Sequence, residues 1–259
     1  MIIGILTAMD NERALISELL ENRHEIKAED IQYTSGSCGR HHIVLASSGI
    51  GKVNAALGAE AMLRLFRPEA LLSTGVAGGI DQSLHVMDVV AGSEYSYHDV
   101  WCGKPNAIGQ VQGMPAVFKG DKNMLSAASM LAMLRAAAGK ENADAVNGKN
   151  KARLENAAKH LINEEPRIHC GLIVSGDQFI ENKERLEVIK KDFPAALAAD
   201  MESAALAQTC FIKKVPFMSF RIISDVAGSE NQLASYTDFW GEMAARSFSV
   251  TKAFIAAIP

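Results

Sequence analysis

Pro216-Phe217-Met218-Ser219-Phe220-Arg221-Ile222-Ile223-Ser224-Asp225 is the stretch of this chain that decides its fold. An apolar run of strand length begins after a proline and ends in a hydroxyl and a carboxylate. The pattern predicts a buried strand that delivers Ser224 and Asp225 to a loop. Open α/β sheets bind their ligands outside the carboxyl ends of such strands. Asp225 is therefore a candidate catalytic group, although it could also only cap the element that follows.

The composition of the chain limits what the protein can be. It has 259 residues, of which 48% are hydrophobic, and this is enough to bury one large core. The net charge is −4 and no basic block stands out, so we expect no nucleic-acid partner. The four cysteines form neither a metal-binding spacing nor a disulfide scaffold. Without a basic leader or an apolar run that could cross a bilayer, we expect a soluble, cytoplasmic protein that does not contact membranes.

Predicted strands and helices alternate along the rest of the chain. Apolar runs predict further strands at 2–6, 43–46, 70–73, 86–91, 169–174 and 195–199, and amphipathic segments between several of them predict helices, the last at 237–258. This order is typical of an α/β domain with its site along one sheet edge. Two more helical stretches, about 122–138 and 151–162, could not bury a core of their own. We therefore predict one domain, 1–259, with a surface helical excursion at about 126–166.

Polar side chains collect where the predicted strands stop. Three carboxylates, Glu12, Glu202 and Asp225, would meet at one sheet edge, beside a glycine-rich segment at 75–79. Glu12 could instead only complement a helix dipole, and the glycines could form a plain turn. A carboxylate that points inward needs a partner, and Arg221 on a neighbouring strand could provide one.

Several common kinds of site are missing from the sequence. It has no nucleophile elbow and no metal-ligand cluster, and the segment SSGIGK at 47–52 lacks the spacing of a phosphate loop. His41 and His42 have no partner at metal-ligand spacing and are predicted to lie at the surface or at the edge of the sheet. Three carboxylates beside apolar walls suit cleavage of a glycosidic bond: one activates water, one protonates the leaving group and one binds sugar hydroxyls.

Seven segments occur in the order and spacing of one known family: GILTAMDNE at 4–12, SSGIGKVNAA at 47–56, TGVAGG at 74–79, YHD at 97–99, GLIVSGDQFI at 171–180, ADMES at 199–203 and RIISDVAG at 221–228. Apart from about 126–166, the chain resembles the methylthioadenosine/S-adenosylhomocysteine nucleosidases of the nucleoside phosphorylase superfamily over nearly its whole length. The resemblance implies a three-layer αβα sandwich around a mixed, partly barrel-like sheet and a homodimer. It also implies hydrolysis of the bond between adenine and ribose without metal or cofactor, as in methionine salvage.

The resemblance also implies roles for individual residues. Glu12 would position and deprotonate water, and Asp225, helped by Ser224, would donate a proton toward purine N7. Glu202, held by Arg221, would bind the ribose hydroxyls. The other implied contacts are Met9 near the anomeric carbon, Met201 on the sugar, Phe179 and the main chain of Ile180 on the base, Val76, Ala77 and Gly78 along ribose and base, Ile50 in the pocket for the 5′-substituent, and Tyr236 as the closing aromatic.

Three departures from the family pattern leave the substrate range open. The chain has Asp200 where the family often has glutamate, Val76 where it has serine, and an unusual segment at 100–104. The alternatives are a purine nucleoside phosphorylase, another nucleosidase such as a futalosine hydrolase, and a non-catalytic nucleoside-binding protein. A phosphorylase needs cations for phosphate, and Glu12 in the first loop would repel that anion, although Arg13 follows it.

Overall fold

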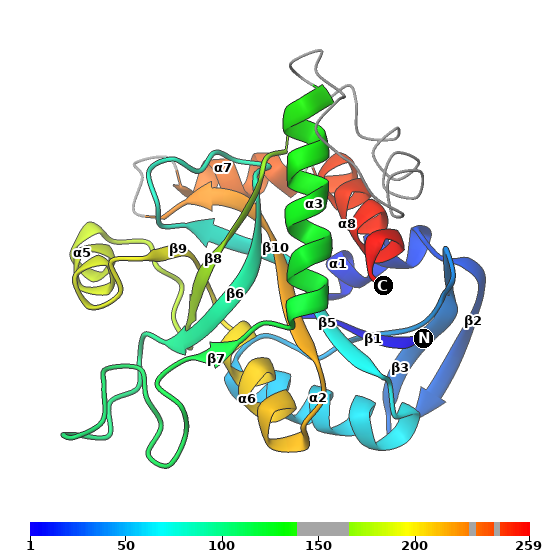
Figure 1. Cartoon of the computed structure of the whole chain (residues 1–259), viewed down its shortest axis with the longest axis horizontal. Coiled ribbons are helices and arrows are strands. Elements are labelled where there is room, and N and C mark those ends of the chain that lie inside the picture. The colour runs from blue at the N-terminus through cyan, green and yellow to red at the C-terminus, as the bar shows by residue number, and fades with distance from the viewer. Residues whose placement is uncertain (139–165, 228–231, 241–243) are drawn as a thin grey trace.

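The computed structural model describes residues 1–138, 166–227, 232–240 and 244–259 (Figure 1). The strands of its sheet are β1 (Ile2–Thr7), β2 (Glu21–Ala28), β3 (Ile31–Cys38), β4 (His41–Ser47), β5 (Ala70–Gly79), β6 (Val89–Tyr97), β7 (Phe118–Lys119), β8 (Ile168–Ser175), β9 (Ala196–Asp200) and β10 (Phe217–Val226). The helices are α1 (Asp10–Glu18), α2 (Lys52–Phe66), α3 (Lys122–Ala138), α5 (Lys183–Asp192), α6 (Ser203–Lys213), α7 (Gln232–Asp238) and α8 (Ala244–Ala257).

The strands form one mixed sheet that is partly closed on itself. Its order is β10-β6-β8-β9-β5-β1-β4-β3-β2, with β7 on β6, and β10 also pairs with β5. This extra pairing closes β10, β6, β8, β9 and β5 into a ring, while β1, β4, β3 and β2 continue as an open sheet. Strand β5 is parallel to β1 and β10 but antiparallel to β9, so the sheet is mixed, as predicted.

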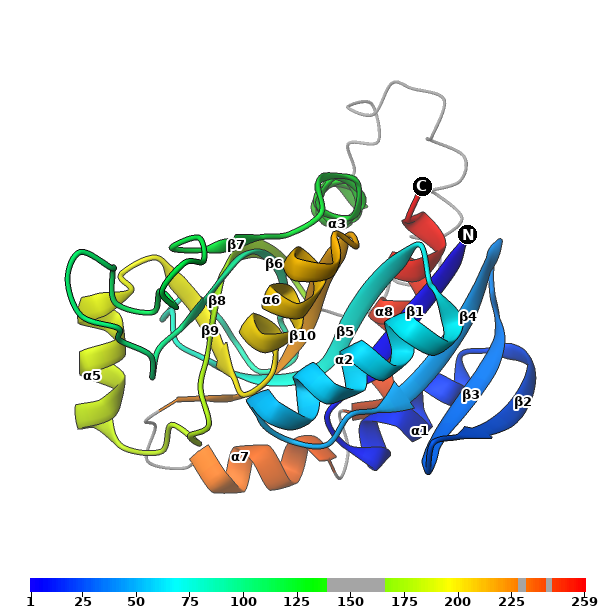
Figure 2. The same cartoon turned by 90° about the horizontal axis from the view of Figure 1, so that it is seen from below.

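Helices cover both faces of the sheet, which completes the predicted three layers. Helices α1, α3 and α8 pack on one face, and α2 and α6 lie side by side on the other (Figure 2). A hydrophobic core lies on each face of the sheet, and side chains of strand β10 contribute to both because they point to opposite faces. Phe220 and Ile222 face the first group of helices, whereas Phe217 and Ile223 face the second. Helix α5 packs through Leu186 and Ile189 on a third, smaller cluster beside β8 and β9.

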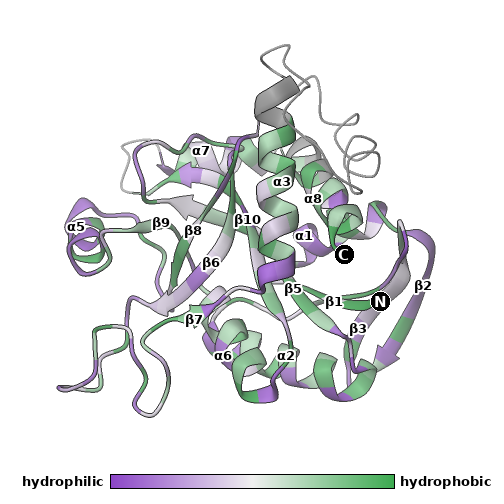
Figure 3. Ribbon diagram, viewed as in Figure 1, coloured by the Kyte–Doolittle hydropathy of each residue, from purple (hydrophilic) through white to green (hydrophobic). Residues whose placement is uncertain are grey.

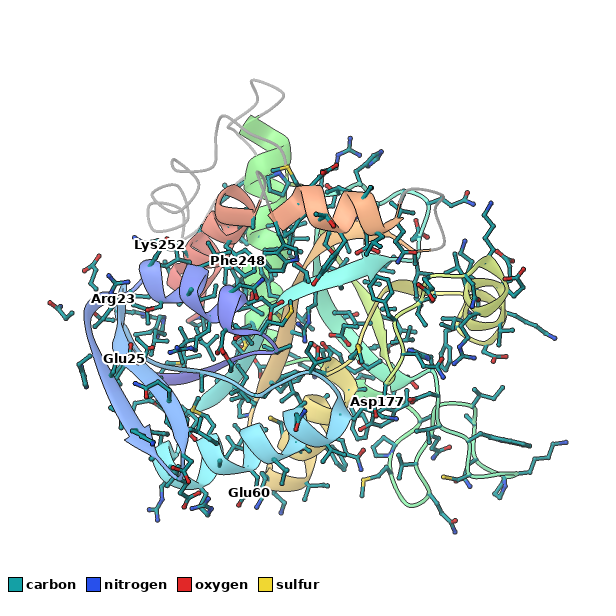
Figure 4. All side chains as sticks on the ribbon, turned by 180° about the vertical axis from the view of Figure 1, so that it is seen from behind. Arg23, Glu25, Glu60, Asp177, Phe248 and Lys252 are labelled. Atoms are coloured by element: carbon teal, nitrogen blue, oxygen red, sulfur yellow. The ribbon has the colours of Figure 1, made fainter. Side chains whose placement is uncertain are left out.

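Charged side chains gather at the outer edge of the sheet and around the helices. Edge strand β2 reads ENRHEIKA and appears hydrophilic in Figure 3, in contrast to the central strands. Charges on an edge strand oppose pairing with another sheet. Figure 4 shows Arg23, Glu25, Glu60 and Lys252 at the periphery, whereas Phe248 of α8 is fully buried.

Three elements differ from the prediction. Helix α3 contributes Ala128 and Leu131 to the core, so the expected surface excursion does not begin at 126; residues 139–165, with the predicted helix at 151–162, lie outside the described residues. The last predicted helix is two helices, α7 and α8. The glycine-rich segment 75–79, for which a plain turn was the alternative, is the end of β5.

The prediction for His41 is wrong. Its side chain is buried, and a ring nitrogen lies 3.1 Å from the Ile258 carbonyl oxygen. This contact joins β4 to the C-terminal end of the chain, a pairing 217 residues apart that local patterns do not contain. His42, the next residue, is exposed. Within the described ranges, no helix is both long and apolar enough to cross a membrane.

Candidate active site

A cavity of about 160 Å³ lies at the carboxyl ends of β1, β5, β8, β9 and β10. This is the sheet edge at which the sequence predicted the site. The cavity lining includes every predicted site residue except Arg221, namely Met9, Glu12, Ile50, Val76, Ala77, Gly78, Phe179, Ile180, Met201, Glu202, Ser224, Asp225 and Tyr236. Segments more than 220 residues apart in the sequence therefore meet around one space.

Glu12 lies in the first turn of α1, where backbone donors surround its carboxylate. Oε2 accepts hydrogen bonds from the amides of Ala8 and Met9, both at 2.9 Å, and Oε1 accepts one from Val76 at 2.9 Å. A glutamate that reaches back to the residue before its helix is the usual capping arrangement. Burial raises the pKa of Glu12, against the Arg221 charge and these three N–H groups, which lower it.

Gly75 lets β5 pass close to Glu12 and Arg221. A Cβ at this position would lie 2.5 Å from Glu12 Oε1 and 2.7 Å from Arg221 Nη1. Both side chains are buried, so neither can move away into solvent. The close approach brings the Val76 amide to the Glu12 carboxylate.

We expect Gly75→Ala to lower kcat by roughly a hundredfold, because displacement of a reacting group by about 1 Å has effects of this size. Overpacking should also lower the free energy of unfolding by about 1–3 kcal/mol. Steady-state kinetics and urea unfolding measure the two effects. Gly113→Ala is the control for backbone strain, since its φ of +81° also disfavours a side chain but a methyl there meets nothing within 4 Å. A normal kcat in Gly75→Ala would show that the Glu12 position is not set by this contact.

A buried ion-pair cluster holds the second carboxylate. Glu202 precedes α6, and its Oε1 accepts a hydrogen bond from the Gly51 amide at 2.9 Å. Arg221 contacts Glu202 Oε2 at 3.5 Å and Asp200 Oδ2 at 2.8 Å. Arg221 is 1% exposed and does not line the cavity. Its guanidinium compensates two carboxylates, and the shorter contact is with Asp200 rather than with Glu202.

The charge balance of this cluster acts on Glu202. Burial raises the pKa of Glu202, Arg221 opposes the rise, and Asp200 adds to it. Asp200 itself is held by hydroxyls, with Ser175 Oγ at 2.5 Å from Oδ1 and Ser203 Oγ bonded to Oδ2. Removal of one partner from such a buried set leaves an uncompensated charge. The cluster therefore fixes Glu202 beside the cavity.

A bulge in β10 places Ser224 and Asp225 together. In the pairing with β5, Ile223 lies opposite Ala77 and Asp225 opposite Gly78, so Ser224 is an extra residue. Such bulges re-aim side chains that would otherwise alternate between faces. Ser224 Oγ consequently donates to Asp225 Oδ1 at 2.6 Å. Burial raises the pKa of Asp225, against the hydrogen bonds from Ser224 and Gln232.

Two glutamines of the cavity wall were missed by the sequence analysis. Gln232 opens α7, and its amide nitrogen lies 2.7 Å from Asp225 Oδ2 and 2.9 Å from the Ile180 carbonyl oxygen. Gln178 belongs to the segment GLIVSGDQFI and could have been found from its place beside Phe179. No comparable signal marks Gln232.

Aromatic and apolar side chains form the outer part of the cavity. The rings of Phe179 and Tyr236 meet edge to face with centroids 6.2 Å apart, and the Tyr236 hydroxyl lies 3.8 Å from Met9 Sδ. Ile50 and Phe179 are 51% and 49% exposed, so they lie at the mouth. The cavity thus has a polar floor and an apolar entrance.

A polar network ties together two loops of the wall. Asp99 Oδ2 accepts from Lys52 Nζ at 2.6 Å and from the Asp177 amide at 2.9 Å, and Asp177 Oδ1 accepts from the Lys52 amide at 2.8 Å. Lys52 follows Ile50 and Gly51, and Asp177 precedes Phe179. These contacts give Asp99 a structural role in the cavity wall. Over the described part of the chain, no group of side chains could hold a metal ion.

The chain is similar to known proteins over nearly its whole length. The family described as the phosphorylase superfamily matches residues 2–256. A 5′-methylthioadenosine/S-adenosylhomocysteine nucleosidase of Staphylococcus carnosus is 33% identical, with 96% of each chain covered. The structure of such a nucleosidase from Colwellia psychrerythraea in complex with adenine has a TM-score of 0.83 at 29% identity, covering 100% of this chain and 96% of that one. Futalosine hydrolase of Helicobacter pylori has a TM-score of 0.78 at 26% identity, covering 98% and 97%.

Proposed function

Because the chain belongs to the phosphorylase superfamily, we propose that it is an N-glycosidase that hydrolyses a 5′-substituted adenosine. The substrate is 5′-methylthioadenosine, S-adenosylhomocysteine or a close relative, and the products are adenine and the 5′-substituted ribose. Relatives with 33% identity over nearly the full chain carry this activity in their names, which supports the proposal.

The observation that carries the proposal is the charge of the cavity wall. Among the described residues, the lining contains the three carboxylates of Glu12, Asp200 and Glu202 beside the acid Asp225, and neither lysine nor arginine. A phosphorylase must hold a phosphate anion, which such a wall would repel. Arg13, which left this possibility open, bonds to Thr34 and pairs with Asp10 and Glu25 instead. Water is therefore the acceptor that the wall suits.

Different surroundings assign different roles to Glu12 and Asp225. Glu12 faces three backbone donors and the Arg221 charge, all of which favour the carboxylate. Among the described residues, the side chains that bond to the Asp225 carboxyl group are the neutral donors Ser224 and Gln232. Two carboxyl groups whose surroundings differ in this way divide into base and acid. Glu12 is the base that takes a proton from water, and Asp225 is the acid that gives one to the leaving purine.

The reaction needs one bond to break and one to form. The bond between the purine nitrogen and the anomeric carbon breaks as Asp225 donates its proton to the purine, and positive charge develops on the sugar. Water, which loses a proton to Glu12, then adds to the anomeric carbon. Glu202 accepts hydrogen bonds from the ribose hydroxyls, and Met9 and Met201 contact the sugar. Phe179 stacks on the base.

The proposed function is tested by incubating the protein with methylthioadenosine, with and without phosphate, and measuring free adenine and the sugar product. We expect adenine and 5-methylthioribose in both mixtures. Adenine release that requires phosphate, with a ribose 1-phosphate as product, would contradict hydrolysis. Failure to release adenine from any purine nucleoside would favour a binding protein instead.

The pH dependence of kcat/KM should be bell-shaped, with both limbs above the usual pKa of a carboxyl group. Activity rises as Glu12 ionises and falls as Asp225 loses its proton, and burial raises the pKa of both groups. Initial rates on methylthioadenosine at pH values from acid to alkaline test this. An alkaline limb that is absent would argue against Asp225 as the acid.

The 5′-substituent of the preferred substrate would distinguish between the related nucleosidase activities. The likeness to futalosine hydrolase supports a second candidate substrate. The exposed side chain of Ile50 at the cavity mouth marks where this substituent would lie. Parallel assays with methylthioadenosine, S-adenosylhomocysteine, 5′-deoxyadenosine and futalosine, ranked by kcat/KM, identify the preferred substrate. A preference for futalosine would assign the chain to that second activity.

A homodimer in the cytoplasm, with a place in methionine salvage, completes the proposal. Helices α2 and α6 lie side by side (Figure 2). Both expose large apolar side chains: Val53 and Leu57 on α2, and Phe211 and Ile212 on α6. A second copy of the chain would cover this apolar surface. The four cysteines are free thiols, which supports a reducing compartment. Sedimentation equilibrium measures the mass of the assembly.

A further inference from the structure

Gln232 lies between Asp225, the proposed acid, and the loop that contains Ile180, which is proposed to contact the purine. Its side chain is buried at the start of α7, which lies beside the end of β10 (Figure 1). The amide nitrogen contacts two acceptors, Asp225 Oδ2 at 2.7 Å and the Ile180 carbonyl oxygen at 2.9 Å. A primary amide nitrogen has two hydrogens and can donate to both, whereas the amide oxygen could not form a hydrogen bond with the Ile180 carbonyl oxygen, which can only accept. The side-chain nitrogen of Gln232, and not its oxygen, therefore faces Asp225 and Ile180.

The two oxygens of Asp225 have partners of different kinds. Oδ2 meets the Gln232 nitrogen, which can only donate. Oδ1 meets the Ser224 hydroxyl at 2.6 Å, which can donate or accept. Ser224 Oγ also lies 3.5 Å from the Ala77 carbonyl oxygen, to which it can turn its hydrogen.

We infer that Gln232 is a positioning residue that keeps the acid proton on Oδ1 of Asp225. The inference rests on the proposed function, in which Asp225 protonates the leaving purine. A neutral carboxyl group has one carbonyl oxygen and one hydroxyl. Since Gln232 can only donate, Oδ2 takes the carbonyl role. Oδ1 then carries the hydrogen, and Ser224 accommodates it by turning toward Ala77.

The side-chain amide of Gln232 also connects α7 to the cavity wall. Tyr236 lies one turn after Gln232, on the same face of α7, and its hydroxyl contacts Met9 Sδ across the opening. Gln232 therefore links the acid, the Ile180 main chain and the closing aromatic. The titratable groups that share this cavity with Asp225 are Glu12, Asp200, Glu202 and Tyr236.

The test compares Gln232→Met and Gln232→Glu with the wild type, and uses Leu233→Ala on the exposed side of α7 as a control. We expect kcat on methylthioadenosine to fall by about tenfold in Gln232→Met. The alkaline limb of kcat should move up by roughly one pH unit, because the ionised acid loses a hydrogen-bond donor. Gln232→Glu should move this limb in the same direction, since a second carboxyl group disfavours ionisation of Asp225. Leu233→Ala should leave both quantities unchanged.

Each outcome decides the inference. If kcat falls but the alkaline limb does not move, Gln232 has only a structural role and the inference is wrong. An unchanged kcat would also overturn the inference. Gln232→Glu preserves the size and polarity of the side chain, so it keeps the test valid if Gln232→Met does not fold. A wild type that releases no adenine would instead contradict the proposed function, before any variant is compared.

Discussion

Asp225→Asn is expected to lower the turnover of methylthioadenosine by about 10²–10⁴-fold, the usual contribution of a general acid. Asparagine has no proton to give to the purine. It does reproduce the hydrogen bonds that we infer for neutral Asp225: its oxygen can accept from Gln232, and its nitrogen can donate to Ser224 Oγ. The cavity should therefore keep its shape, so that the loss falls on kcat and leaves nucleoside affinity nearly unchanged.

Two measurements separate these effects. Release of adenine over time gives kcat, and calorimetric titration with methylthioadenosine gives Kd. Asp10→Asn is the matched control, because Asp10 begins α1 near the site but its side chain is 88% exposed. Near-normal turnover in Asp225→Asn would mean that the purine leaves without this acid.

Glu12→Gln is expected to cause a loss of similar size for a different reason. The amide cannot take a proton from water, so the nucleophile is no longer activated. Both oxygens of Glu12 also accept backbone hydrogen bonds, and the NH₂ group of glutamine must face at least one of these N–H donors. Two donors that face each other in a buried site are unfavourable. We therefore expect Glu12→Gln to disturb the loop at Ala8 and Met9 as well as the chemistry.

The two variants should consequently differ in binding. Asp225→Asn is expected to bind methylthioadenosine normally, whereas Glu12→Gln should bind it more weakly because the displaced loop carries Met9. The same titration measures both affinities, again beside Asp10→Asn. Normal turnover in Glu12→Gln, with Asp225→Asn inactive, would require another base for the water.

Much of this site could be predicted from the sequence because its parts are local. A strand that ends in Ser224 and Asp225, or a loop with Glu12 just inside a helix, is visible in a few consecutive residues. The order and spacing of several such segments then carried the family resemblance that implied their roles. Arg221 was also recognised as a partner of buried acids, although its contact with Asp200 is closer than the predicted one with Glu202.

The features that escaped prediction depend on contacts between distant segments. The β10 bulge follows from pairing with β5, about 150 residues earlier, and has no signature within 217–226. His41 is buried by the C-terminal end of the chain, and Gln232 becomes important only because α7 reaches both Asp225 and Ile180. An isolated polar residue gives no sign of what surrounds it in the folded chain.

The closure of the ring has a consequence for how this protein is made. Strand β10, which lies between β5 and β6 and carries Asp225, is the last strand in the chain. While the ribosome is still adding residues before 217, the β5 and β6 edges that β10 later covers have no partner. Unpaired strand edges of an incomplete chain are prone to associate with other chains. The nascent protein is thus most exposed to aggregation just before its active site can form, and it gains protection and activity in the same step.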